Sequence, residues 1–323
     1  EAHASALVDN QTVIAGGWDD DLLKLDIQDL KLEMPDLDMT TFGFSDKQTG
    51  KKAEEDDFDV DAALASDVEA ITKPGDLIIL GDHRLLCGDS TKKEDVERLM
   101  NGKRAQICFT SPPYNVGHLD IEGDESTKRK YRNDDDDRDQ AEFFEFLRKN
   151  VELMRGCCDE VFYNMGMYQN NKKAIIQLIN NNIDAFNDII YWVKPNGTPV
   201  IQEGVLNNNI EWIMVFGNGK RKFMHAQFPR GTRYNTIEAA CASTNKISSI
   251  HKATMPMAIP DNIIPFFTDH GAIVVDCFGG SGTTLISCER HGRQCYMMEL
   301  DPIYCDVIVQ RWEEYTGEKA VRP

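Results

Sequence analysis

An apolar strand followed at once by a glycine-rich turn constrains the fold of this chain more than any other feature. Residues 272–275 form a β-branched run typical of a buried strand, and the turn Gly279-Gly280-Ser281-Gly282 follows directly. A helix is expected to begin near Thr283 and to end at Gly292. A strand, a tight turn and a helix N-terminus form a concave site whose free N–H groups can bind an anionic or carboxylate-bearing ligand.

The next strand supplies an acid at the spacing of a nucleotide site. Residues 293–298 are predicted to form this strand, and Glu299 follows it, 20 residues after Gly279. That distance fits a carboxylate that binds ribose hydroxyls in a βαβ fold. Leu285 stands where a dinucleotide fingerprint requires a third glycine, which argues against an ordinary nicotinamide site. The alternative is a turn that only connects a strand to a helix.

A second motif, Thr110-Ser111-Pro112-Pro113-Tyr114-Asn115, follows a strand predicted at residues 105–109. Its prolines fix two φ angles and remove two N–H donors, so the turn is stiff and its carbonyls are unpaired. The Ser111 hydroxyl and the Pro112 carbonyl are suited to accept both hydrogens of a planar amine. Tyr114 is suited to stack on a base that has left a duplex. The alternative is a structural Pro-Pro turn with Tyr114 in the core.

Together, and in this order, the two motifs resemble the β class of S-adenosylmethionine-dependent DNA amino-methyltransferases, which form N4-methylcytosine or N6-methyladenine. The catalytic motif precedes the glycine motif in that class, which is a circular permutation of the usual order. The resemblance covers about residues 75–315. It implies an α/β, Rossmann-like methyltransferase fold with a mixed seven-stranded sheet and helices on both faces.

The resemblance also assigns site residues. Asp89, in the segment Leu86–Ser90, would lie near the cofactor adenine, and Lys252 belongs to a segment that packs on the methionine end. Thr254-Met255-Pro256 departs from the Lys-Pro pair of many members, which puts the role of Lys252 in doubt. The implied catalytic residues are Ser111, Pro112, Pro113 and Tyr114, and the implied cofactor residues are Asp89, Asp276, Phe278, Gly279, Gly280, Ser281, Gly282, Thr283, Glu299 and Lys252.

Charge is divided unevenly along the chain. Residues 1–75 carry 19 acidic and 6 basic side chains, so most of the net charge of −19 lies in this stretch. We interpret residues 1–75 as an acidic appendage whose first part resembles the tail of a ParB-like domain and whose residues 45–72 form a polar linker. Residues 76–323 are then the methyltransferase domain.

A basic stretch with interleaved aromatic residues lies between residues 218 and 254 and overlaps the target-recognition insert that the resemblance implies at about residues 197–250. Such a stretch can neutralise phosphates, although a solvated loop is the alternative. A further charged loop, residues 117–139, resembles the mobile loop that closes over DNA in relatives, although a charge run is more often simply solvated. The predicted DNA-binding residues are Lys220, Arg221, Lys222, Arg230, Arg233 and Lys246.

Composition narrows the chemistry. The nine cysteines show no Cys-x-x-Cys spacing, so we expect no metal site, and the absence of a Pro-Cys dipeptide excludes the nucleophile of cytosine-C5 methyltransferases. No membrane span or signal peptide is visible, and a cytoplasmic, bacterial or phage-encoded protein is expected, with a homodimer on double-stranded DNA. Ser before Pro-Pro-Tyr favours N4-cytosine slightly over N6-adenine. An RNA methyltransferase and a catalytically idle DNA-binding protein are the alternatives.

Overall fold

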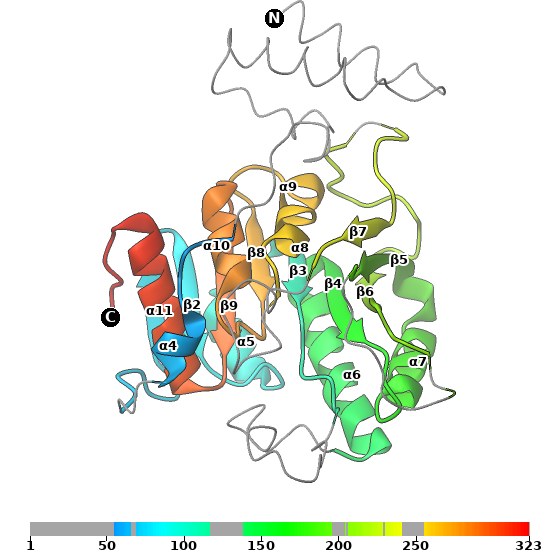
Figure 1. Ribbon diagram of the computed structural model, residues 1–323, viewed down its shortest axis with the longest axis horizontal. Helices are drawn as coiled ribbons and strands as arrows, with labels where there is room; N and C mark the ends of the chain where they lie inside the picture. The colour runs from blue at the N-terminus through cyan, green and yellow to red at the C-terminus, as the bar shows by residue number, and fades with distance from the viewer. Residues whose placement is uncertain are drawn as a thin grey trace, which may run out of the picture.

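A nine-stranded mixed sheet forms the centre of the computed structural model (Figure 1), which describes residues 55–65, 69–116, 138–195, 204, 206–228, 230–240 and 255–322. The order of strands is β1-β2-β9-β8-β3-β4-β6-β5-β7. Neighbours from β2 to β4 are parallel, whereas β6 is antiparallel to both β4 and β5. The strands are β1 (Leu77–Leu80), β2 (His83–Cys87), β3 (Ala105–Thr110), β4 (Cys158–Gly166), β5 (Phe186–Val193), β6 (Ile210–Phe216), β7 (Thr236–Glu238), β8 (Ile273–Asp276) and β9 (Gln294–Glu299).

Helices cover both faces of the sheet, as the α/β prediction requires (Figure 1). One face carries α4 and α8 to α11, and the other carries α5 to α7. The helices are α4 (Val60–Ala65), α5 (Lys93–Met100), α6 (Gln140–Cys157), α7 (Lys172–Asn181), α8 (Ala258–Asp261), α9 (Ile264–Phe267), α10 (Thr283–Arg290) and α11 (Pro302–Thr316), with a short 3-10 turn η3 (Ile183–Ala185). Within the described ranges, none of these helices is long and apolar enough to cross a membrane.

Each face of the sheet has its own hydrophobic core. Along β3, Ile107 and Phe109 pack with the α8 to α11 side, whereas Cys108 between them packs with the α5 to α7 side. All three side chains are fully buried. Successive side chains of a strand point to opposite faces, so a strand covered by helices on both faces must be apolar throughout.

The sheet has two strands more than the seven predicted, and both lie at its edges. β1 pairs antiparallel with β2 through a turn at Gly81, whose φ is 57°. β7 has three residues, of which only Ile237 is partly buried, and pairs with β5. β1 has four residues and β7 has three, so each contains only a short apolar run. The prediction of the sheet, which relied on the two motifs, therefore includes neither strand.

Residues 55–65, expected to belong to a polar linker, contact the methyltransferase fold. Phe58 and Val60 are buried against Val307 of α11. We therefore propose that residues 55–65 belong to the folded domain, in contrast to the predicted boundary at residue 76. The ParB-like tail, residues 117–137 of the charged loop, Lys246 and Lys252 lie outside the described residues.

Candidate active site

The two sequence motifs meet at the carboxyl ends of neighbouring parallel strands. β3 pairs with β8, with Ile107 opposite Val274 and Cys108 opposite Val275. Beyond this pairing, the Thr110 hydroxyl donates to Asp276 Oδ1 at 2.6 Å, which links residues 166 positions apart. This edge of a parallel α/β sheet is where such folds bind ligands.

The glycine turn encloses the Glu299 carboxylate. Gly280 N–H donates to Glu299 Oε2 at 2.8 Å, and Asp301 N–H donates to Oε1 at 2.9 Å. Gly280 has a φ of 53° and Gly282 a φ of 86°, a region that favours glycine. A Cβ on Gly280 would meet no described atom within 4 Å, so the turn faces open space there.

Asp89 reaches the same edge from β2. Gly88 N–H donates to the Glu299 carbonyl at 2.9 Å, which places the segment after β2 beside the end of β9. Asp89 Oδ1 accepts from the Thr91 hydroxyl at 2.7 Å and from Thr91 N–H at 2.9 Å. The structure thus brings Asp89, Glu299 and the glycine turn together, and Asp89 also caps its own turn.

Burial raises the pKa of two carboxyls at this edge. The pKa of Asp276 rises to about 6, although its hydrogen bonds from Thr110 and Phe278 N–H oppose the shift. Burial likewise raises the pKa of Glu299 to about 7, against the backbone hydrogen bonds from Asp301 and Gly280. Glu299 therefore titrates near neutral pH.

Four polar side chains surround Ser111. Its Oγ lies 3.1 Å from the Tyr114 hydroxyl and 3.3 Å from Asn164 Nδ2. The Tyr114 hydroxyl donates to Glu211 Oε2 at 2.6 Å, and Asn164 Nδ2 lies 2.7 Å from that hydroxyl and 2.8 Å from Glu211 Oε2. Glu211 Oε1 pairs with Lys194 Nζ. Burial and the Glu211 carboxylate raise the pKa of Tyr114 well above its usual value, so Tyr114 is a neutral phenol.

Two acceptors near Ser111 have no donor in the described part of the chain. No described residue donates to the Pro112 carbonyl, as the prediction for a Pro-Pro turn requires. Asn164 Oδ1 is also buried without a partner among the described residues. A buried acceptor that lacks a donor is costly, and a ligand that carries N–H groups would satisfy it.

Asparagine side chains fix the backbone that follows the motif. Asn115 is buried with a φ of 56°, and its Oδ1 accepts from Arg138 N–H at 2.7 Å while its Nδ2 donates to the Arg138 carbonyl at 2.8 Å. Asn171 Nδ2 donates to the Tyr114 carbonyl at 2.6 Å. Asparagine tolerates the left-handed region better than most residues. Ser111 to Asn115 are thus held on several sides.

Sequence reasoning assigned no site role to Glu211, Asn164, Lys194 or Asn171. Glu211 and Asn164 lie in β6 and β4, outside the two motifs from which the site was predicted. A signal was present, because Glu211 interrupts the apolar strand β6 and is buried there. A charged residue in a buried strand requires a partner, and this one has Lys194.

Three of the six predicted DNA-binding residues, Lys220, Arg221 and Lys222, lie at the end of the sheet opposite to Ser111. β6 runs antiparallel to β4, so the chain beyond Phe216 emerges at the end of the sheet away from Ser111. Lys220 N–H donates to Asn187 Oδ1, and Arg221 pairs with Asp188 at 3.2 Å, both at the start of β5. Lys222 follows directly, and Arg230 is exposed in the same stretch.

Arg233, the next predicted DNA-binding residue, is held by the fold. Its guanidinium lies 3.3 Å from the centroid of the Phe266 ring, and its Nη2 donates to the Asn262 carbonyl at 3.1 Å. It precedes β7, whose parallel pairing with β5 returns the chain to the edge that carries Ser111. These contacts favour a structural role for Arg233.

Comparison with known proteins decides the family. The family model for N6 and N4 methyltransferases, described as DNA methylase, matches residues 105–310. The chain belongs to the DNA methylase family. The matched part of the chain begins with β3 and ends within α11, so it contains both motifs and confirms the family resemblance seen in the sequence.

The curated relatives match shorter parts of the methylase. The type II methyltransferase M.Cfr9I of Citrobacter freundii is 28% identical over 127 residues, which are 38% of this chain and 42% of the relative. The type II methyltransferase M.BglI of Bacillus subtilis is 37% identical over 65 residues, 20% of this chain and 19% of the relative. The chain thus matches less than half the length of these relatives.

Solved structures share the fold. The PvuII DNA methyltransferase, described as cytosine-N4-specific, aligns with a TM-score of 0.53 and 17% identity over 77% of this chain and 94% of its own. The M1.HpyAVI complex with S-adenosylmethionine aligns with a TM-score of 0.50 and 17% identity over 70% of this chain and 97% of its own. The Rossmann-like methyltransferase fold is therefore confirmed.

Proposed function

We propose that this methylase transfers a methyl group from S-adenosylmethionine to an exocyclic amino nitrogen of a base flipped out of double-stranded DNA. The observation that carries the proposal is the 2.6 Å hydrogen bond between Thr110 and Asp276. It fixes the Ser-Pro-Pro-Tyr turn beside the glycine turn, as a reaction between two bound molecules requires. Family membership supports DNA as the substrate.

The residues at the glycine turn fit the proposed cofactor. Open space at Gly280 leaves room for a ligand, and the adjoining Glu299 carboxylate suits ribose hydroxyls. Asp89 lies on the adenine side in the family pattern, and Phe278 packs against Phe146 with ring centroids 5.7 Å apart. When bound, S-adenosylmethionine supplies an electrophilic methyl group, and the protein supplies alignment.

Ser111 and Pro112 orient the amine in the proposed reaction. The Ser111 hydroxyl and the Pro112 carbonyl accept its two hydrogens, so that the nitrogen lone pair is freed from the ring and faces the methyl group. Tyr114 provides a face for the base, with its hydroxyl held by Glu211. The amino nitrogen forms its bond to the methyl carbon as the S–CH3 bond of the sulfonium breaks, so S-adenosylhomocysteine is the leaving group and no covalent enzyme intermediate forms. The methylated nitrogen then loses one proton to solvent.

Cytosine N4 is the target we favour, because Ser rather than Asp precedes Pro-Pro-Tyr; adenine N6 is the alternative. DNA is proposed to approach the edge of the sheet that carries Ser111. The exposed side chains Tyr168 and Ile210 follow β4 and begin β6 at that edge. The recognition insert near residues 197–250 and a homodimer remain predictions.

Product analysis tests the reaction. The protein is incubated with S-adenosylmethionine and unmethylated duplex DNA, single-stranded DNA or RNA, and the digested nucleosides are identified by mass spectrometry. N4-methylcytosine or N6-methyladenine from duplex DNA is the expected result. Methylation of RNA alone, or cofactor binding without a methylated product, would overturn the proposal in favour of an RNA enzyme or a DNA-binding protein.

Substitution of Ser111 by alanine tests its role. Turnover should fall by about a hundredfold, as for loss of one group that acts in the transition state, while the Kd for S-adenosylmethionine stays unchanged. Thr316→Ala, which removes a hydroxyl at the end of α11, is the control. An equal loss of turnover and of cofactor affinity in Ser111→Ala would contradict the assignment.

A further inference from the structure

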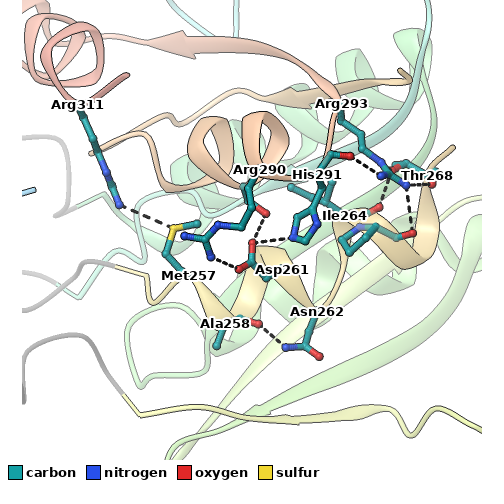
Figure 2. A network of polar contacts seen from close by, with 12 residues as sticks. Met257, Ala258, Asp261, Asn262, Ile264, Thr268, Arg290, His291, Arg293 and Arg311 are labelled. Carbon is teal, nitrogen blue, oxygen red and sulfur yellow. Dashed lines mark hydrogen bonds and ion pairs between the residues drawn. The ribbon is translucent and has the colours of Figure 1, made fainter. Parts of the chain in front are cut away.

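Arg311 is a buried cation directly behind the glycine turn. It projects from α11 and its side chain is 3% exposed (Figure 2). Its Nε donates to Asp56 Oδ2 at 2.6 Å and its Nη2 to Asp56 Oδ1 at 2.7 Å. This is the two-point geometry in which a guanidinium binds a carboxylate most strongly.

The third nitrogen of the same guanidinium contacts the turn. Nη1 donates to the Ser281 carbonyl at 2.9 Å and lies 3.3 Å from Ser281 Oγ and 3.2 Å from Thr283 Oγ1. Gly282 between them has a φ of 86°, in the left-handed region that glycine adopts without steric cost. One side chain thus joins Asp56 to two residues of the proposed cofactor site.

Neighbouring contacts hold Asp56 in place. Glu55 Oε1 accepts from Met257 N–H at 3.0 Å, and Met257 Sδ lies 3.8 Å from Arg311 Nη2 (Figure 2). Val60 packs with Val307, one helical turn before Arg311 on α11. The segment that begins at Glu55 is therefore attached to α11 and to the start of α8 at the same place.

We propose that Asp56 and Arg311 are positioning residues that fix the glycine turn in the conformation that binds S-adenosylmethionine. The inference rests on the proposed function. Without the Asp56 carboxylate, the guanidinium loses two of its donor contacts inside the protein and must seek water or other acceptors. It would then leave the Ser281 carbonyl, and the turn would have to be ordered by the cofactor itself. The segment before the sheet therefore completes the cofactor site from behind.

Cofactor binding to the full chain tests this inference without DNA. Asp56→Asn should raise the Kd for S-adenosylmethionine, measured by titration calorimetry, by about tenfold, because the turn is less ordered before binding. Asp59→Asn is the matched control, since Asp59 is an exposed acid of the same segment whose carboxylate accepts from Ala62 N–H. Its Kd should stay within about twofold of the wild type. With saturating cofactor, turnover of Asp56→Asn should recover while its KM remains raised.

The outcomes separate the two proposals. If the wild type does not bind S-adenosylmethionine, the proposed function fails. If the wild type binds and folded Asp56→Asn binds equally well, the positioning role fails while the proposed function stands. Should Asp56→Asn not fold, Arg311→Lys decides, because an ammonium keeps the charge but not the planar fork that spans Asp56 and Ser281. An unchanged Kd in folded Arg311→Lys would overturn the inference.

Discussion

Glu211 orders the polar network around Ser111 through three donors. Its carboxylate accepts from Tyr114, Asn164 and Lys194, and its side chain is 6% exposed. Glu211→Gln should lower turnover by about tenfold or more and leave the cofactor Kd unchanged, because the amide cannot replace the carboxylate toward all three. Unfolding in urea should show a loss of up to about 3–5 kcal/mol, since Lys194 loses the Glu211 carboxylate in a partly buried site.

A suitable control for Glu211→Gln is Glu238→Gln, because Glu238 is an exposed acid of β7. Turnover in the control should equal that of the wild type. If cofactor affinity in Glu211→Gln falls as much as turnover does, Glu211 stabilises the whole site and does not act specifically by aligning Tyr114.

Glu299 makes both stability and cofactor affinity depend on pH, in opposite directions. Burial raises the pKa of Glu299 from 4.5 to about 7. Between these two pH values the folded protein therefore holds a proton on Glu299 that the unfolded chain has lost. Its contribution to the free energy of unfolding is therefore largest at low pH and is lost as pH rises through about 7. A carboxylate is the better acceptor for ribose hydroxyls, so cofactor affinity should rise from about pH 6 to pH 8.

Calorimetric titration across this pH range checks the Glu299 prediction. Glu299→Gln should remove the part of the pH dependence that the carboxyl causes, whereas Glu314→Gln, at an exposed acid of α11, should keep it. If the cofactor Kd depends on pH in the same way in the wild type and in Glu299→Gln, the ionisation of Glu299 does not control cofactor binding.

At the scale of the element, the glycine turn requires glycine at positions 279 and 280 for two different physical reasons. A Cβ on Gly279 would lie 2.8 Å from Met297 Cγ and Sδ, whereas a Cβ on Gly280 would meet open space at a φ of 53°. Gly279→Ala should cost about 1–3 kcal/mol of stability through overpacking. Gly280→Ala should cost about 1–2 kcal/mol through backbone strain and should also weaken cofactor binding, because the methyl group enters the ligand's space.

Gly102→Ala is the control for Gly280→Ala. Gly102 has a φ of 72° with no atom within 4 Å of a Cβ, and it lies between α5 and β3, away from the turn. Denaturation and cofactor titration should show a similar loss of stability for both variants and weaker binding for Gly280→Ala alone. Equal binding by both would mean that the cofactor does not approach Gly280.

The elements around the glycine turn could be predicted because local signals agree there. The apolar run, the glycines and the stop at Gly292 each mark a boundary, and β8, α10 and β9 follow within a residue or two. Pro265 lies in the first turn of α9, and residues 258–267 form two short helices, α8 and α9, rather than one. α4 was missed because its few apolar residues are stabilised by α11, far away in the chain.

At the scale of the whole molecule, the direction of β6 decides which basic residues can face DNA. Lys220, Arg221 and Lys222 lie at the edge opposite Ser111, which no count of charges along the chain could reveal. Replacing all three by glutamine should change the Kd for duplex DNA by less than about threefold at fixed salt, measured by fluorescence anisotropy. A loss of tenfold or more, with a smaller salt dependence, would show that DNA extends to that edge.

The two hydrogen bonds between Asn115 and Arg138 affect how the stretch of chain between these residues can vary. It joins the two ends of the intervening stretch of chain at the rim of the site. Ser111 and Tyr114 are held from the other side, by Asn164, Glu211 and Asn171. An insertion or exchange within residues 117–137 should therefore leave the contacts of Ser111 and Tyr114 in place, because these contacts come from β4, β6 and the start of α7.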